Sequence, residues 1–393
     1  MKLLKSFFSL SLILLISYPF TALATETRLN SMGGTKLYTR DNTDIFTFPG
    51  TIHQYAGQAV GELRAKGNND QYSIGFQTEE ESFGTFGVYL NNPVDYYFQD
   101  IKDQLNYLQN VEIERKIDVF YGRKLTGFDL GLHVSLAIDR WLDEDPNGDG
   151  NKDDKHKESA HLFSVGAGVS SDLFDVAAEF DFPGFKAEVA KEEETIGATG
   201  IGLNGRMYLG NKEGLEIIPV GQFYIGPGNY KYDMGITGAK TEEIDINKLE
   251  LALGLGFNYH IDKNNLLILG VKGFGLDKFS YDEKDGDEGS GQTMTLPGVY
   301  FGIESQIKPW LTGRFGGSQI YRSTKETYKP KDGKETSESI FDDDFGLTFG
   351  LGLHFGDFTL DALIDEGLFF DGPNFISGTN EVMSTQLSLL YNF

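Results

Sequence analysis

The chain has no cysteine, few prolines and no excess of basic residues, and these shortages narrow what it can be. Its 393 residues contain 11 Pro against 49 Gly, and 34 Lys and Arg against 59 Asp and Glu, which gives a formal net charge of −25. The absence of cysteine is compatible with an oxidising periplasm but identifies no compartment by itself. Nucleic-acid binding would require a basic patch, which is missing, so we expect no nucleic-acid partner.

Long apolar runs are also missing beyond the N-terminus. No segment after residue 24 approaches the roughly 18 apolar residues of a membrane-spanning helix. At the N-terminus, Lys2 and Lys5 precede an apolar run over 7–20, and Ala22-Leu23-Ala24 offers a small-x-small cleavage site. We therefore predict a signal peptide over residues 1–24; the alternative is a membrane-anchor helix. Removal of the signal would change the formal net charge to −27.

Two stretches, 249–261 and 345–355, alternate strictly between apolar and small or polar residues. Leucine and aromatic residues occupy every second position, with mainly Gly, Ala, Thr, Asn and His between them. Successive side chains of a strand point to opposite faces, so each stretch has one apolar face. These runs exceed or equal the roughly 9–11 residues that cross a bilayer at a tilt. They predict an all-β fold, a transmembrane antiparallel β-barrel, rather than a soluble sheet.

Alternation and breakers together predict about 16 strands between 56–66 and 380–393, with 14 as the alternative count. The connections between them alternate in length. Short ones lie near 125–126, 170–172, 210–213, 262–263, 308–309 and 356–357, and long ones lie at 91–115, 141–158, 227–245, 281–291, 324–342 and 367–379. Short periplasmic turns and long external loops are expected of an outer-membrane barrel, which places both termini on the periplasmic side.

The last strand ends the chain on an aromatic residue. Leu387, Leu389, Tyr391 and Phe393 share one face of the strand. This pattern resembles the C-terminal signature of outer-membrane proteins, in which such a segment is recognised by the β-barrel assembly machinery. We therefore expect localisation in the cell outer membrane as a multi-pass barrel, with that machinery, outer-membrane lipid and lipopolysaccharide as partners.

Residues 25–55 lack sustained alternation and precede the first strand. The inward faces of the two best strands are largely glycine, which is favoured where another backbone packs closely. We therefore predict that residues 25–55 form a plug inside a barrel made by residues 56–393. The predicted plug residues are Met32, Gly33, Gly34, Asp41, Asp44, Phe46, Phe48 and Pro49.

This segment resembles the N-terminal hatch of the long-chain fatty-acid transporter family. The similarity lies in Arg28-Leu29-Asn30-Ser31-Met32-Gly33-Gly34 and in the run from Asp41 to Gly50, where Phe48 stands in place of the usual Asn before Pro49. The resemblance implies a plugged 14-stranded barrel that passes hydrophobic compounds. A protein-secretion partner of related shape belongs to the same broader group.

An acidic loop has the spacing of a calcium-binding loop. Asp145, Asn147, Asp149, Asn151 and Asp153 fall at alternate positions around Gly150. In an EF-hand-type loop such side chains converge on one ion, with a bidentate Glu at position 12. Here His156 occupies position 12. Calcium is therefore one interpretation, and a solvated acidic loop without any cofactor is the other.

Residues 94–110 carry apolar side chains at helical spacing, among them Tyr97, Phe98, Ile101, Leu105 and Leu108. This predicts an amphipathic helix inside the longest external loop. The helix can be a lid that packs on the barrel rim, or one wall of a groove for an apolar ligand.

The six histidines show no close metal spacing, and the inward ones are expected to be hydrogen-bonded to the plug. A rim pair such as Asp139 and His161 is expected by chance among 59 carboxylates, so we predict no enzyme. The function that best fits is a channel or transporter for small hydrophobic molecules. The alternatives are a structural or secretion-associated barrel that docks partner proteins and, third, an outer-membrane hydrolase.

Overall fold

The protein is a single closed sheet with a short, mostly helical segment packed against its inner face. The computed structural model describes residues 25–64, 71–80, 82–94, 110–111, 113, 115–144, 155–190, 192–235, 242–284, 286–364 and 384–393. The predicted signal peptide, the calcium-type loop and, except for its end residues Val94 and Asn110, the predicted amphipathic helix over 94–110 lie outside these residues. None of the helical segments in the described ranges has the length and apolarity needed to span a membrane.

The N-terminal segment, residues 25–56, contains three short helical pieces: α2 (Glu26–Asn30), η1 (Asn42–Phe46) and η2 (Pro49–Tyr55). Each begins where the sequence supplies a helix-starting residue. The Thr25 side chain accepts a hydrogen bond from the Arg28 backbone N–H at 3.2 Å, Asp41 and Asp44 form a capping box, and Pro49 occupies the first position of η2.

After it, the described ranges contain eighteen β-segments. They are β1 (Gln58–Arg64), β2 (Gln71–Gln77), β3 (Thr85–Pro93), β4 (Arg115–Leu125), β5 (Phe128–Asp143), β6 (His156–Ser170), β7 (Phe174–Val189), β8 (Glu192–Ala198), β9 (Gly200–Met207), β10 (Leu209–Gly210), β11 (Leu215–Asp233), β12 (Glu242–Asp262), β13 (Asn265–Glu283), β14 (Glu288–Lys308), β15 (Leu311–Lys329), β16 (Thr336–Phe355), β17 (Phe358–Ile364) and β18 (Ser384–Asn392).

Every pairing in the sheet is antiparallel, and the sheet closes because β1 pairs with both β2 and β18. β8, β9 and β10 follow one another along the same line beside β11, so the 18 segments form 16 strands of the barrel wall. Each of the 16 predicted strands overlaps one of these. The all-β antiparallel barrel and the larger of the two predicted strand counts are therefore confirmed for the described residues.

The two faces of the wall differ as the alternation predicts. On β16, Phe345 and Leu351 point outward and are 63% and 40% exposed, whereas Gly350 between them faces the N-terminal segment. The outward face carries a broad band of exposed Leu, Ile, Val and Phe side chains. A closed barrel with an outward apolar band and small or polar inward residues has the architecture of an outer-membrane protein. The protein is therefore a barrel of the outer membrane.

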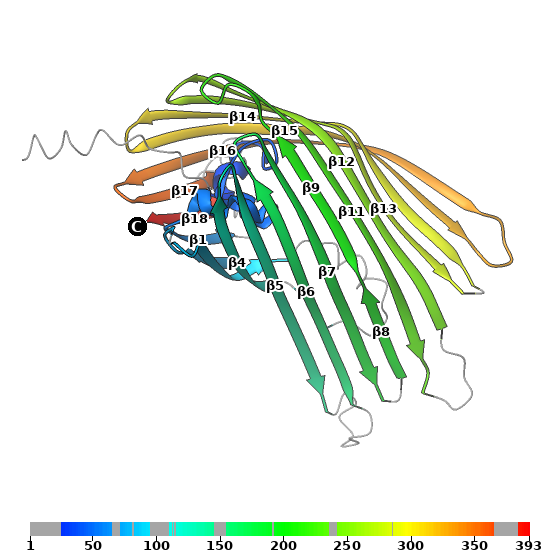
Figure 1. The fold of residues 1–393 in the computed structure, drawn as a ribbon. Coiled ribbons are helices and arrows are strands. Elements are labelled where there is room, and N and C mark those ends of the chain that lie inside the picture. Colours follow the sequence, from blue (N-terminus) through cyan, green and yellow to red (C-terminus); the bar gives the residue numbers. More distant parts are fainter. Residues whose placement is uncertain are drawn as a thin grey trace, which may run out of the picture.

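The wall is much taller on one side than on the other (Figure 1). Strands β11 to β16 have 19–21 residues, whereas β1, β2 and β17 have 7 each. Several tall strands continue beyond their predicted ends. For example, β16 starts at Thr336 rather than at 343 and pairs with β15 as far as Tyr328. Ladder hydrogen bonds extend these strands although their apolar alternation has ended.

Candidate functional site inside the barrel

The N-terminal segment lies against the inner wall at the end of the barrel that carries the short turns and the C-terminus (Figure 1). Wall glycines on different strands approach it so closely that a Cβ atom would meet its backbone or side chains. A Cβ on Gly316 would lie 2.2 Å from Met32, one on Gly131 would lie 2.0 Å from Pro49, and one on Gly270 would lie 2.3 Å from Tyr38. The inward glycines therefore provide the room in which this segment packs.

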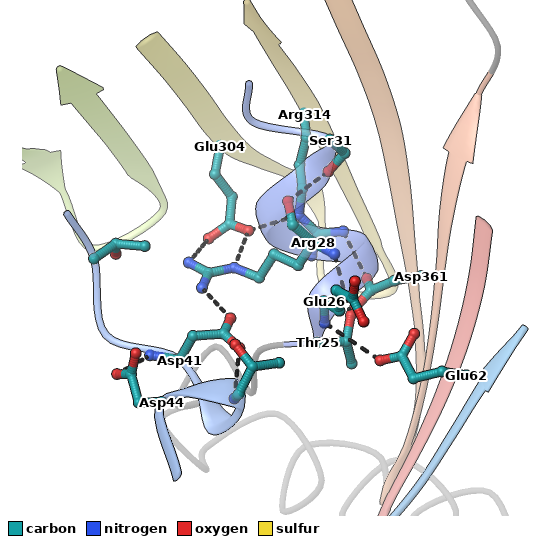
Figure 2. Close-up of polar contacts among 12 residues, drawn as sticks. Thr25, Glu26, Arg28, Ser31, Asp41, Asp44, Glu62, Glu304, Arg314 and Asp361 are labelled. Atoms are coloured by element: carbon teal, nitrogen blue, oxygen red, sulfur yellow. Dashed lines mark hydrogen bonds and ion pairs between the residues drawn. The ribbon is translucent and has the colours of Figure 1, made fainter. Parts of the chain in front are cut away.

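A series of ion pairs, in which arginines and carboxylates alternate, binds α2 to strands β14, β15 and β17 of the wall (Figure 2). The Arg28 guanidinium donates to both oxygens of Glu304 on β14, from Nε at 2.7 Å and from Nη2 at 2.8 Å. Arg314 on β15 donates to Glu304 at 2.7 Å and to Asp361 on β17 at 2.6 Å. Thr25 donates to Asp361 at 2.8 Å. All five groups are buried, so each charge depends on its neighbours.

A second cluster lies where the barrel closes. Glu62 on β1 is opposite Ser388 on β18, and both are buried. Glu62 accepts hydrogen bonds from Ser388, from the Thr27 hydroxyl at 3.3 Å and from the Glu26 backbone N–H at 3.3 Å. Thr27 and Ser388 also contact each other through their hydroxyls. Residues of α2 thus bind across the pairing of the first and last strands.

On the opposite side of the lumen, Arg206 on β9 binds the middle of the segment. It donates to Asp44 at 3.1 Å, to Asp175 on β7 at 2.8 Å and to the Thr39 carbonyl at 3.1 Å. Its guanidinium carbon lies 4.6 Å from the ring centre of Phe48. The Arg206 side chain is wholly buried, so this is a desolvated ion cluster with a cation–π contact.

Asp41 and Asp44 cap η1 and remain inaccessible to solvent. Asp41 accepts a hydrogen bond from the Thr43 N–H at 3.0 Å, and Asp44 accepts one from the Asp41 N–H at 2.9 Å. Burial raises the pKa of Asp41 to about 7, although the Arg28 guanidinium, 3.5 Å away, acts in the opposite direction. Burial also raises the pKa of Asp44, against the effect of Arg206.

Most of the predicted plug residues lie in this buried packing. Phe46 packs edge-on against Tyr89 and Phe120 of the wall, with ring centres 4.9 and 5.4 Å apart. Gly34 is the exception, because it is exposed. The residues in or against the packed segment are Met32, Gly33, Asp41, Asp44, Phe46, Phe48 and Pro49.

Sequence reasoning missed the wall residues that bind the segment. Those that contact the segment directly include Glu62, Arg206, Glu304, Asp361 and Ser388, and two more, Asp175 and Arg314, bind these wall residues. A usable signal was present, because charged residues at inward positions of a membrane-spanning strand face the lumen and need partners there. Their partners, however, lie tens to hundreds of residues away and are identified only by the register of the strands.

Beyond the segment, towards the long loops, the lumen contains a cavity of about 600 Å³. Phe46 and Thr47 of the segment border it, as do residues of the wall on β4, on β6 and β7, on β9 and on β11 to β15. Its charged side chains are Lys116, Glu179, Asp181, Lys248, Glu250, Lys272, Asp277 and Arg322. A smaller cavity of about 110 Å³ lies between the segment and β1 to β4 and shares Phe46 and Lys116 with the large one.

The outer half of the inner wall also carries a patch of apolar side chains. Its buried members are Val111, Ala137, Ala160, Leu162, Phe185, Ala187, Ile196, Tyr230 and Ile246, and Val94 and Ile113 pack against them. Leu162 and Val94 border the large cavity as well. Val94, Val111 and Ile113 flank the predicted apolar helix. Glu158, which is buried, accepts hydrogen bonds from the backbone N–H groups of Asn110 at 2.8 Å and Val111 at 3.1 Å.

No group of three His, Asp or Glu side chains suited to a metal ion occurs within the described ranges. The most buried histidine, His133, has its Nε2 atom 2.8 Å from Asp118 and stacks on Phe120 with ring centres 4.4 Å apart. Phe46 of the segment lies edge-on to this histidine, at 6.5 Å. These contacts are those of a packed wall residue.

The predicted assembly-signal residues lie on the outer face of β18. Leu387, Leu389 and Phe393 are exposed there, and Phe393 stacks on Phe76 of β2 with ring centres 5.2 Å apart. Tyr391 stacks on Phe358 of β17 at 4.5 Å. The Phe393 backbone N–H donates to the Gly57 carbonyl at 3.0 Å, so the last residue also contacts the residue before β1.

No protein-family model matches the chain, and no curated protein matches it. Among solved structures it is similar to the toluene transporter TodX of Pseudomonas putida, with 11% identity and a TM-score of 0.38 over 96% of this chain and 98% of that one. A TodX deltaS2S3 mutant, described as a monoaromatic hydrocarbon channel, gives 11% identity and a TM-score of 0.41 over 95% and 100%.

The alcaligin outer-membrane receptor FauA of Bordetella pertussis is similar at 6% identity and a TM-score of 0.36, over 86% of this chain and 75% of that one. These similarities are low. The assignment as an outer-membrane barrel therefore rests on the closed sheet and its two faces.

Proposed function

We propose that this barrel passes small, mainly hydrophobic molecules across the outer membrane and that residues 25–56 act as its plug. The observation that carries the proposal is the packing of the segment against inward glycines on widely separated strands. A segment held on several sides of the lumen is unsuited to an open, porin-like pore. Slow passage of particular ligands past the segment, or after its displacement, fits this arrangement better.

The apolar patch on the outer half of the inner wall supports the choice of ligand. Apolar side chains such as Leu162 and Phe185 are unusual on the inward face of a water-filled barrel, which is polar. Leu162 and Val94 border the large cavity, so an apolar ligand in that cavity could pack against this edge of the patch. It would gain roughly 25 cal/mol for each Å² of its own apolar surface that it buries there.

The plug is tested by conductance in planar bilayers. The full chain should show little steady ion conductance, whereas deletion of residues 27–50 should open a large one. Removal of the exposed loop tip 330–335 serves as a control for chain shortening and should leave conductance low. Equal, large conductance in all three proteins would show that the segment does not close the barrel.

The ligand class is tested separately by binding of a neutral aromatic hydrocarbon, naphthalene, to the protein in lipid nanodiscs. Leu162→Asp, which places a charge in the apolar patch, should weaken binding by roughly tenfold or more. Leu209→Asp, at an exposed position outside the patch, is the matched control. If the unaltered protein takes up no more naphthalene than empty nanodiscs, hydrophobic transport is wrong.

A further inference from the structure

The large cavity is lined by four basic and four acidic side chains, and most of them form ion pairs. Lys248 lies 2.6 Å from Asp277 and 3.3 Å from Glu250, and Lys116 lies 3.6 Å from Asp118. In a chain with 34 basic residues against 59 acidic ones, an equal number of each in one cavity is a local enrichment in positive charge.

Two cations are poorly compensated. Lys272 on β13 has no carboxylate within 4 Å among the residues that the structure describes, and the two acids that act on it electrostatically, Glu250 and Asp277, are bound to Lys248. Arg322 on β15 contacts Asp344 at 3.3 Å. That pair is 37% and 58% exposed, so solvent screens it and its contribution is small.

The two cations lie on β13 and β15, the strands on either side of β14. In the register of the sheet, Lys272 is opposite Gly298 of β14, and Arg322 is opposite Thr295 of the same strand. Both side chains border the same cavity, as does Thr295, and the positive charge of Arg322 acts on Lys272. Two positive charges that repel each other in one cavity favour an anion between them.

We propose that Lys272 and Arg322 form an anion-binding site in the lumen, which takes the carboxylate or phosphate group of a small molecule. The guanidinium can bind two anion oxygens in a fork, the ammonium supplies a point charge, and the Thr295 hydroxyl can donate to a third oxygen. The anion can be a free polar one or the charged end of an amphiphile whose apolar part reaches Leu162 and Val94. The site itself does not depend on hydrophobic transport.

The test measures equilibrium binding of three probes to the protein in nanodiscs, with empty nanodiscs subtracted: octanoate, 1-octanol and inorganic phosphate. Because each lost hydrogen bond to a charged group weakens binding by roughly tenfold or more, the double variant Lys272→Gln/Arg322→Gln should bind octanoate at least tenfold more weakly. Its binding of 1-octanol should be unchanged, since the alcohol has no charge.

Lys325→Gln is the matched control, because Lys325 is an exposed cation on the same strand as Arg322. It should leave all three affinities unchanged. If the unaltered protein binds octanoate but not phosphate, and the double variant loses octanoate binding, the site takes the charged end of an amphiphile. If the unaltered protein binds phosphate and the double variant loses that binding, the site takes free anions. Both outcomes support the proposal. The proposal is overturned if the unaltered protein binds octanoate no more tightly than 1-octanol and does not bind phosphate, or if the double variant binds both anions normally. Naphthalene binding, measured in parallel, reports on hydrophobic transport independently.

Discussion

At the scale of single residues, the interior differs from an ordinary protein core in the number of charges that it buries. Arg28, Arg206 and Arg314 are all buried and each contacts carboxylates. Removing one partner of such a cluster leaves an uncompensated charge, which costs far more than the loss of an exposed pair. The stability of the packed segment should therefore depend on a few arginines.

Arg206→Met should lower the free energy of unfolding by about 3–5 kcal/mol, because it leaves Asp44 and Asp175 buried without their cation. Urea-induced unfolding in lipid vesicles measures this loss. Arg64→Met is the matched control, since Arg64 pairs with Glu26 at a site that is 13% and 23% exposed. Its loss should be clearly smaller, and equal losses in the two variants would contradict the role of burial.

A pH effect should follow from Asp41. Its pKa is about 7 in the folded protein, whereas an unfolded aspartate has a pKa of about 4, so the folded state holds a proton that the unfolded state releases between these values. The contribution of Asp41 to stability is therefore complete below pH 4 and falls by about 1.4 kcal/mol per unit up to pH 7.

Asp41→Asn removes this dependence, so relative to the unaltered protein the variant should gain stability as the pH rises from 5 to 8. The temperature at which the folded, fast-migrating band disappears on gels measures the difference. Asp287→Asn is the comparison: a hydrogen bond from the Tyr328 hydroxyl lowers the pKa of this carboxyl, so the pH dependence that it contributes lies below about pH 4, and the profile of this variant from pH 5 to 8 should have the same shape as that of the unaltered protein. Identical pH profiles for Asp41→Asn and the unaltered protein would rule out the buried carboxyl as the cause.

At the scale of elements, α2 does more than fill space. It contacts β14 through Arg28 and, through Thr27, both Glu62 of β1 and Ser388 of β18. The first helix therefore stabilises the closure of the barrel, and its release would break contacts at the pairing of the first and last strands. Displacement of the whole plug is the most costly route for a ligand, because it breaks this cluster and the Arg206 cluster together.

A disulfide tests whether α2 moves during passage. The hydroxyls of Thr27 and Ser388 touch, and the chain contains no other cysteine, so Thr27→Cys/Ser388→Cys should form one defined bond. If α2 must leave the wall, the oxidised variant should lose most of its naphthalene uptake into proteoliposomes, and reduction should restore it. The two single-cysteine variants control for loss of the hydroxyls. Full uptake in the oxidised variant would show that ligands pass while α2 stays in place.

At the scale of the whole molecule, the short turns and the long connections define two ends of the barrel. The chain lacks cysteine, so single cysteines report on each end. A membrane-impermeant maleimide should label Asp332→Cys, between β15 and β16, in intact cells, and should reach Glu213→Cys, in the turn before β11, only after the outer membrane is broken. Labelling of Glu213→Cys in intact cells would reverse the orientation.

Much of this plan could be predicted from the sequence, because alternation is local. The run from Phe345 to Phe355 shows both faces of β16 directly, and the turn after it lies where expected. The extension of β16 to Thr336 was missed, since Thr336–Phe341 has no apolar alternation and is held by pairing with β15. For the same reason the segment's own residues were found but their partners Arg206 and Glu304 were not. The calcium-type loop and the amphipathic helix over 94–110 remain predictions.

The unequal height of the wall has a consequence for the surrounding lipid. The described parts of β1 and β2 have 7 residues each, which at a rise of about 3.3 Å and a tilt of about 40° span about 18 Å of membrane thickness. The apolar band of such barrels is about 25 Å tall, and the 21-residue β12 on the opposite side exceeds it easily. Beside this low side of the described wall we expect the bilayer to become thinner or the barrel to lean towards its tall side. We therefore expect the protein to be tilted in the membrane, with its long strands inclined and the bilayer locally thinner along the low side of the wall.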